Sequence, residues 1–132
     1  MDKVTLRIPA EPAYVPVIRL IAAGLASRLK LTLEDIDDLR IAVDELATYL
    51  VGLHGREGTL EVHFMLHDDR IEIHGLGHFA EGEKVRTDLT ELSRMILETV
   101  ADSASLRAID GSPGFALTKK RPSDSPSEVG LP

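Results

Sequence analysis

The spacing of apolar residues between Thr32 and Leu50 limits the fold of this chain more than any other feature. Large aliphatic residues recur there at steps of three and four residues: Ile36, Leu39, Val43, Leu46 and Leu50. This spacing places all of them on one face of an α-helix. Thr32, followed three residues later by Asp35, resembles a helix N-terminus in which Asp replaces the Glu or Gln of a capping box. The segment therefore predicts an amphipathic helix that must bury its apolar face against a second layer.

Strands predicted on both sides of this helix supply that layer. Alternating apolar and polar residues predict short strands over residues 3–8, 59–66, 70–74, 105–109 and 115–119. Apolar residues at helical spacing predict a first helix over 14–29 and a third helix that begins at a capping pair, Asp88 and Glu91. The Gly-rich, charged stretch 75–86 predicts a surface loop. The order βααββ, loop, αββ predicts an α+β fold, a two-layer α/β sandwich whose mixed, mostly antiparallel sheet carries three helices on one face.

Length and composition fit a single domain. The chain has 132 residues, of which 43% are hydrophobic and 4% aromatic, so it can fill one aliphatic core. We expect the domain to span residues 1–121 and the Pro- and Ser-rich residues 122–132 to form a disordered tail. The sequence has no signal-peptide pattern, no apolar run long enough to span a membrane and no cysteine. These features predict a cytoplasmic protein without disulfides or cysteine-ligated zinc.

The charge of the chain narrows the kinds of partner. The formal net charge is −7, and basic residues are scattered except for the cluster Lys119–Arg121. A nucleic-acid-binding protein normally carries a basic stripe that replaces phosphate counterions. The pattern favours a partner with a basic surface over a nucleic acid, and the absence of a long apolar run argues against a membrane span. The alternative is that the acidic charge only aids solubility.

Two polar residues stand out on the helix after Thr32. Glu45 lies almost opposite the aliphatic stripe, and Tyr49 follows it by one turn. Ile41 and Thr48 flank Glu45, so this second face is mixed and partly apolar. Such a face is typical of a helix that lies between a sheet and a ligand or partner. The alternative is a solvated Glu45 on an exposed face.

Other chemical motifs are weak in this sequence. His63 and His67, and likewise His74 and His78, are four residues apart, but they fall on predicted strands and a loop, where this spacing does not converge on a metal. We therefore expect surface histidines and no metal site. The sequence contains no dinucleotide-binding fingerprint, no P-loop and no nucleophile elbow. It gives no support for nucleophilic catalysis.

The segment Asp37-Asp-Leu-Arg-Ile-Ala-Val-Asp-Glu-Leu-Ala-Thr-Tyr-Leu50 resembles the N-box helix of the GHKL (histidine-kinase-like) ATPase superfamily. It is most similar to the small anti-sigma-factor serine kinases of bacterial stress and sporulation switches. The stretch Val15-Pro-Val-Ile-Arg19 and the segment Leu92–Asp102 are also similar to that family, and the resemblance covers residues 3–121. It implies the Bergerat-type sandwich and an ATP site.

The resemblance identifies a glutamate and a departure on the N-box helix. In that family the N-box glutamate activates water or the hydroxyl to be phosphorylated, and an Asn one turn later holds Mg²⁺. Glu45 matches the glutamate, whereas Tyr49 occupies the Asn position. A phenol is a poor Mg²⁺ ligand.

Further departures fall on the rest of the implied nucleotide pocket. His74 replaces the family's adenine-binding Asp, Leu76 replaces a Gly two residues later, and Phe115 replaces a Thr near the last strand. The lid before the third helix, Thr87–Glu91, contains no glycine. The resemblance therefore implies a degenerate pocket in a domain that keeps its fold.

These features favour an anti-sigma factor that sequesters an alternative sigma factor, is countered by an anti-anti-sigma antagonist of the STAS type, and needs no cofactor. Arg19 matches an arginine that contacts both partners in the family, although it could equally be an ordinary surface arginine. One alternative is a working serine-protein kinase that uses ATP, Mg²⁺ and Glu45. Another is a reshaped cavity, lined by Tyr49, His74 and Phe115, that binds a different small molecule. Small family members also tend to be homodimers, which the sequence neither shows nor opposes.

Overall fold

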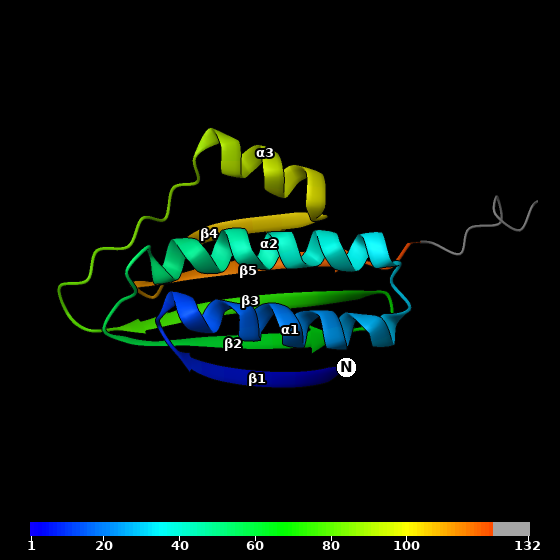
Figure 1. Ribbon diagram of the computed structural model, residues 1–132, viewed down its shortest axis with the longest axis horizontal. Helices are drawn as coiled ribbons and strands as arrows, with labels where there is room; N and C mark the ends of the chain where they lie inside the picture. Colours follow the sequence, from blue (N-terminus) through cyan, green and yellow to red (C-terminus); the bar gives the residue numbers. More distant parts are fainter. Residues whose placement is uncertain (123–132) are drawn as a thin grey trace, which may run out of the picture.

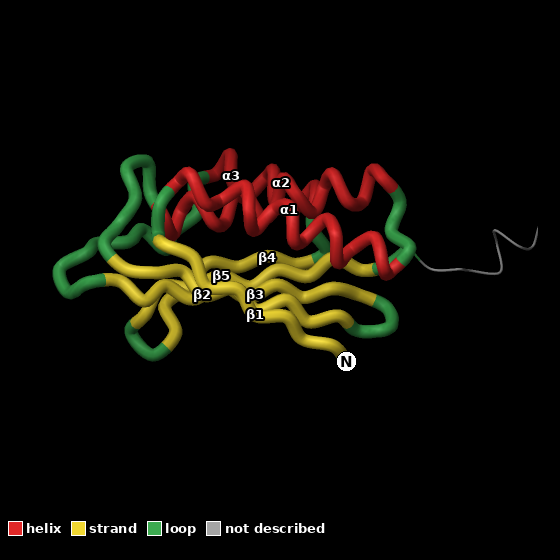
Figure 2. The backbone as a smooth tube through the Cα atoms, turned by 60° about the horizontal axis from the view of Figure 1, so that its bottom comes forward, coloured by secondary structure: helices red, strands yellow, loops and turns green. Residues whose placement is uncertain are grey.

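One five-stranded sheet and three α-helices build the fold, and all three helices lie on the same face of the sheet (Figures 1 and 2). The computed structural model describes residues 1–122. The elements in chain order are β1 (Asp2–Pro9), α1 (Val15–Ala26), α2 (Leu33–Val51), β2 (Gly58–Leu66), β3 (Arg70–Phe79), α3 (Glu91–Val100), β4 (Ser103–Ile109) and β5 (Ser112–Lys120). Short 3₁₀ turns, Pro12–Tyr14 and Ser27–Leu29, flank α1. The predicted α+β two-layer sandwich is confirmed.

The strand order in the sheet is β1-β2-β3-β5-β4. Each of the four neighbouring pairs is antiparallel, so the parallel component expected of a mixed sheet does not occur among residues 1–122. The strands β1 and β4 form the two edges. The segment that contains α3 connects β3 to the edge strand β4, and α3 packs beside α2.

The core lies between the sheet and the helices. The aliphatic stripe of α2 is confirmed as its buried face, because Leu39, Val43, Leu46 and Leu50 have no exposed surface. Phe64 of β2 meets this face from the sheet. Burial of this many aliphatic side chains is the main favourable term in folding.

The strand β3 is longer than the sequence pattern predicts. It continues from Arg70 to Phe79, so Gly75 and Leu76 belong to the strand and the predicted surface loop begins only after it. Both neighbouring strands pair with this extension. Gly58 of β2 lies opposite Phe79, and Gly114 of β5 lies opposite Leu76. Backbone pairing on two sides therefore outweighs the local preference of glycine for loops.

The helix N-termini confirm one predicted cap and correct another. The backbone N–H of Asp35 donates to Thr32 Oγ1 at 3.0 Å, as expected for an N-cap. The third helix is capped by Thr90 and not by Asp88, because Thr90 Oγ1 accepts from the backbone N–H of Ser93 at 3.1 Å. This places Thr90 and Ser93 at the end of α3 that lies against α2.

Two expectations concern the end of the chain and the membrane. The predicted disordered tail, 122–132, lies outside the described residues except for Pro122. Within residues 1–122, no helix combines the length and the apolar composition needed to cross a membrane.

Candidate functional site

Glu45 lies on the side of α2 that faces α3. Its Oε2 atom accepts a hydrogen bond from Ser93 Oγ at 2.7 Å. Ser93 belongs to the first turn of α3 and is only 7% exposed. Of the two interpretations of the sequence, a covered face describes Glu45 better than a solvated one, and the element that covers it is α3 of the same chain.

Tyr49 lies one turn after Glu45 and contacts the same end of α3. Its hydroxyl donates to Ser93 Oγ at 2.9 Å, accepts from the backbone N–H of Thr90 at 2.8 Å and lies 3.2 Å from Thr90 Oγ1. Burial raises the pKa of the Tyr49 phenol, but the hydrogen bonds with Ser93 and Thr90 outweigh this effect and leave the pKa below its ordinary value of 10.0. Glu45, Tyr49, Thr90 and Ser93 thus form one connected polar cluster, named here the α2–α3 cluster.

The α2–α3 cluster satisfies hydrogen-bond donors at the N-terminus of α3. The first N–H groups of a helix have no partner within the helix and commonly bind anions such as phosphate. In this protein the Thr90 N–H donates to Tyr49 and the Ser93 N–H donates to Thr90 Oγ1. Two donors that could hold a phosphate group are therefore used within the chain.

Phe115 lies in the core between β5 and the helices and has no exposed surface. It is the cross-strand partner of Gly75, and a Cβ atom on Gly75 would lie 2.2 Å from Phe115 Cε2. A Cβ atom on Gly77 would lie 2.4 Å from Phe79 Cε2. The two glycines of β3 leave space on the helix-covered face of the sheet, and these two aromatic rings fill it.

His74 and Leu76 do not line a pocket with these residues. Successive side chains of a strand point to opposite faces, and Gly75 is the residue of β3 that faces Phe115. His74 is exposed on the outer face, opposite His63 of β2, with Nε2 3.8 Å from Glu72 Oε1. The assignment of His74 and Leu76 to the pocket, which the family resemblance implied, is wrong. The alternation that buries Ile73 turns His74 outward, and the strand continues through the predicted loop and turns Leu76 outward as well.

A cavity lined jointly by Tyr49, His74 and Phe115 is therefore not formed. Tyr49 contacts α3, Phe115 is in the core, and His74 lies on the opposite face of the sheet. The alternative of a reshaped small-molecule pocket built from these three side chains is contradicted by their placement.

The outer face of the sheet carries an ionic cluster on β1, β2 and β3. Arg7 Nη2 donates to Glu61 Oε1 at 2.6 Å, and His63 Nε2 lies 2.6 Å from Glu61 Oε2. His78 Nε2 lies 3.4 Å from Glu61 Oε1. The hydrogen bond from Arg7, followed by that from His63, lowers the pKa of Glu61 to about 2 from an ordinary value of 4.5.

This pKa shift predicts a pH-dependent contribution to stability. Because the folded-state pKa of Glu61 is depressed, its contribution is fully present above the ordinary value of 4.5 and is lost as the pH falls toward about 2. We expect Arg7→Ala to lower stability at about pH 5 but much less at about pH 3. Urea midpoints at the two pH values measure this difference. Arg40→Ala on α2 is the control, and an equal effect of Arg7→Ala at both pH values would contradict the assignment.

Arg19 lies on α1 at the seam with α2. Its Nη1 atom donates to Asp44 Oδ2 at 2.5 Å, and about a third of each side chain is exposed. Arg19 and Asp44 both line two cavities of about 250 and 430 Å³, one toward each end of α2. The apolar side chains of Val17 and Leu20 are exposed on the same helix, α1, and that of Ile41 is exposed on α2. Arg19 is thus part of an accessible surface and does not contact the α2–α3 cluster.

The sequence pattern singles out neither Thr90 nor Ser93. A signal was present, since Thr90-Glu-Leu-Ser93 begins with a preferred N-cap residue. The competing pair Asp88 and Glu91 offered a similar pattern two residues earlier. Only the packing of α3 on α2 brings the hydroxyls of Thr90 and Ser93 to Glu45 and Tyr49.

One protein family matches this chain over most of its length, and individual relatives match about half of it. The family model of the histidine kinase-like ATPase domain matches residues 8–132. Serine-protein kinase RsbW of Bacillus pumilus (strain SAFR-032) is 42% identical over 78 residues, which cover 55% of this chain and 48% of that protein. The proteins of the same name from Bacillus velezensis and from Bacillus cereus (strain B4264) are 42% identical over 77 residues and 39% identical over 74 residues. They cover 55% and 54% of this chain, and 48% and 46% of the respective relatives.

The chain thus spans about half the length of the curated relatives that it matches. The family match, in contrast, includes every element from α1 to β5. By sequence and by fold, this protein belongs to the histidine kinase-like ATPase domain family.

Proposed function

We propose that this protein is a cytoplasmic anti-sigma factor that binds and sequesters an alternative sigma factor and is countered by an anti-anti-sigma antagonist of the STAS type, without effective ATP binding. Membership of the histidine kinase-like family supports the scaffold. The similarity to proteins named serine-protein kinase RsbW supports a place among the regulators that the N-box segment resembles. The arrangement of the α2–α3 cluster supports the loss of ATP binding.

The observation that carries this proposal is the hydrogen bonding of Tyr49. Its hydroxyl, at the position of the Mg²⁺-binding amide, already accepts from Thr90 and donates to Ser93. A neutral phenol offers Mg²⁺ a poor ligand, since this ion prefers carboxylate, carbonyl and water oxygens in octahedral geometry. Two N–H groups at the N-terminus of α3, those of Thr90 and Ser93, are also occupied. These side chains do not fit Mg-ATP.

The packing between the sheet and the helices also argues against binding of the adenine base of ATP. Phe115 occupies the space above Gly75, with no exposed surface left on its side chain. An adenine at this position would have to displace a packed aromatic ring from the core. Displacing such a ring costs several kcal/mol, about 3–5 for its removal altogether.

One observation favours the second candidate, a serine-protein kinase. Glu45 is retained, and its carboxylate accepts a hydrogen bond from a serine hydroxyl at 2.7 Å. This is the geometry that a general base needs toward a hydroxyl. The candidate requires that a substrate serine replace Ser93 and that Mg²⁺ be held without an amide ligand.

Arg19 is our candidate contact for the protein partners. Its guanidinium is held by a single carboxylate and is about a third exposed, so its remaining N–H groups can pair with carboxylates of a partner. The exposed Leu20 and Val17 add apolar contact area beside it. A surface of this kind combines an arginine with apolar anchors, as interface hot spots commonly do.

The test combines nucleotide binding with partner binding. Calorimetric titration of this protein with Mg-ATP is expected to give no binding heat at millimolar nucleotide, whereas the RsbW protein of Bacillus pumilus serves as the positive control. A saturable heat would support the kinase candidate, and Glu45→Gln should then abolish phosphate transfer to a serine of the antagonist.

Affinity capture from the native cell, with and without Mg-ATP, tests the partners. We expect the same sigma factor to be retained in both conditions, and Arg19→Glu to weaken its binding about tenfold or more. Arg28→Glu, a charge reversal at an exposed site after α1, is the matched control. Absence of any sigma factor or antagonist among the captured proteins would end the proposal.

A further inference from the structure

Polar contacts tie both ends of the helix α3 to the rest of the domain, and Leu97 and Val100 anchor its inner side in the core. At its N-terminus, Thr90 and Ser93 bind Glu45 and Tyr49 through the α2–α3 cluster. At its C-terminus, Lys119 Nζ donates to the backbone oxygen of Val100 at 3.0 Å. The two ends are therefore attached to different partners, α2 and β5.

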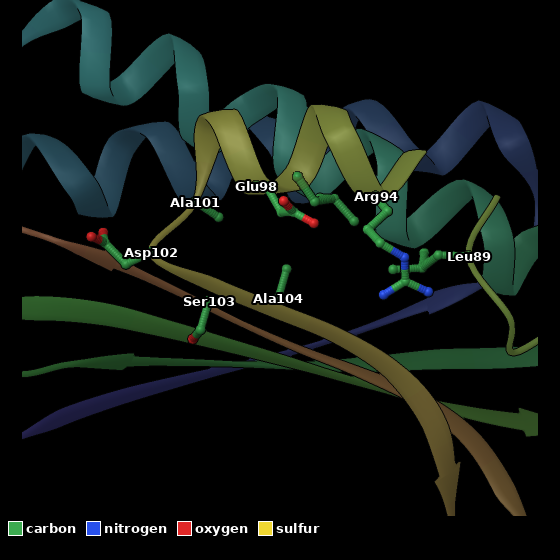
Figure 3. Close-up of a pocket in the computed structure, with 8 residues that line it drawn as sticks. Leu89, Arg94, Glu98, Ala101, Asp102, Ser103 and Ala104 are labelled. Atoms are coloured by element: carbon green, nitrogen blue, oxygen red, sulfur yellow. The ribbon is translucent and has the colours of Figure 1, made fainter. Parts of the chain in front are cut away.

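Between its ends, α3 is not closely packed on β4. A cavity of about 320 Å³ lies between the helix and this edge strand. Figure 3 shows Arg94 extending from α3 toward β4 beside Leu89, and Glu98 on the helix above Ala104. Neither Arg94 nor Glu98 has an ion-pair partner within residues 1–122. Leu97 is the residue of α3 that reaches deepest, at 3% exposed.

Few apolar contacts hold the outer side of α3. Leu92 and Met95 are 67% and 60% exposed, so much of the apolar surface of this helix remains in water. Segments with little apolar burial and an adjacent cavity open locally at lower free energy than the core. Leu97 and Val100 anchor the C-terminal half of α3 in the core, so local opening would break the polar contacts of its N-terminal turn first.

We propose that α3 is a lid over Glu45 that is latched closed by Ser93 and Tyr49, with Ser93 as an internal substitute for an incoming hydroxyl. Ser93 Oγ takes the hydrogen bond at Glu45 Oε2 that a substrate serine or a water molecule would take. Tyr49 completes the latch by accepting from the Thr90 N–H. Opening of α3 would release Glu45 and the Thr90 N–H together, whereas the Ser93 N–H would stay capped by Thr90 Oγ1.

The latch deepens the proposed function and rests on it, since it concerns the same glutamate, but it does not require any nucleotide. The closed position follows from hydrogen bonds within the chain. The groups that compete with the latch are defined by its chemistry: a hydroxyl donor for Glu45 and an anionic oxygen for the N–H group of Thr90. A partner or ligand that supplies both would stabilise the open lid.

The experiment uses the absence of cysteine from this chain. The substitution Leu97→Cys introduces a single thiol beneath α3, and Leu46→Cys introduces one on α2, where the native residue has no exposed surface. The rate of reaction with a soluble thiol reagent reports lid opening at the first position and opening of the core at the second. We expect the thiol at position 97 to react faster than the thiol at position 46.

Variants of the latch separate the lid from global unfolding. Adding Ser93→Ala or Tyr49→Phe should raise the reaction rate of the thiol at position 97 about tenfold, as expected for the loss of one or two hydrogen bonds, and leave the rate at position 46 nearly unchanged. Thr99→Val is the matched control, because Thr99 Oγ1 only donates to the Met95 oxygen within α3. Equal rates at the two positions, or no response at position 97 to either latch variant, would overturn the proposal.

Nucleotide distinguishes failure of the latch from failure of the proposed function. Mg-ATP is expected to leave the reaction of the thiol introduced by Leu97→Cys unchanged, because the proposed function excludes effective ATP binding. If Mg-ATP alters the rate while Ser93→Ala still accelerates it, the latch is supported and the absence of ATP binding is refuted. If Mg-ATP has no effect and the latch variants have none either, the latch alone is refuted.

Discussion

Replacement of Lys119 by methionine is expected to lower the free energy of unfolding by about 3 kcal/mol. Lys119 is 9% exposed, and its Nζ lies 3.5 Å from Asp38 Oδ2 and 3.7 Å from Asp35 Oδ1. It also donates to the Val100 oxygen at the end of α3. Without the ammonium group, two partly buried carboxylates would repel each other and Val100 would lose its donor. Removing one partner of a buried ion pair costs about 3–5 kcal/mol, and the partial exposure of both aspartates places the effect at the lower end.

Urea unfolding of the native protein and of Lys119→Met measures this loss. The matched control is Lys120→Met, which removes the same charge from the next, exposed residue and is expected to change the free energy of unfolding by less than about 0.5 kcal/mol. Similar effects of the two substitutions would mean that Lys119 contributes only through net charge. The helix α3 would then lack a specific anchor at its C-terminus.

Phe115→Ala is expected to cost about 4 kcal/mol of the free energy of unfolding. The ring is fully buried, and it fills the space that Gly75 leaves open on β3. Its removal deletes a large apolar contact and leaves a cavity that the rigid sheet cannot close. Urea unfolding measures this effect as well, and Phe115→Leu should cost much less because it keeps most of the volume.

A double-mutant cycle tests the contact between Phe115 and Gly75. Gly75→Ala alone places a Cβ atom 2.2 Å from Phe115 Cε2 and should destabilise by about 2 kcal/mol through overpacking. In the Phe115→Ala background the same methyl group enters the cavity, so it should be neutral or stabilising. Additive effects of the two substitutions would show that they do not share this space. The cycle also tests the occupation of the proposed base-binding region, because both residues lie there.

The candidate site is predictable in part. Helical spacing assigns Glu45 and Tyr49 to one face of a helix, and both lie there in the structure. The family resemblance misplaces His74 and Leu76. The alternation of the predicted strand 70–74 already turns His74 away from the core, whereas the glycines around Leu76 indicate a loop that strand pairing on both sides replaces. Whether a segment is a loop or a strand decides where its side chains point, because successive side chains of a strand lie on opposite faces of the sheet.

Local, periodic signals in the amino-acid sequence are sufficient to define the elements and the two-layer α+β fold. The stripe of α2, the Thr32 cap and the alternating strands each depend on residues that are close to one another in the sequence. Long-range packing, in contrast, establishes that α3 covers Glu45, that Ser93 and Thr90 complete the α2–α3 cluster and that Phe115 occupies the space above Gly75. These contacts join residues that are about forty positions apart in the chain, and no local period encodes their geometry, because it follows from how the layers fit together.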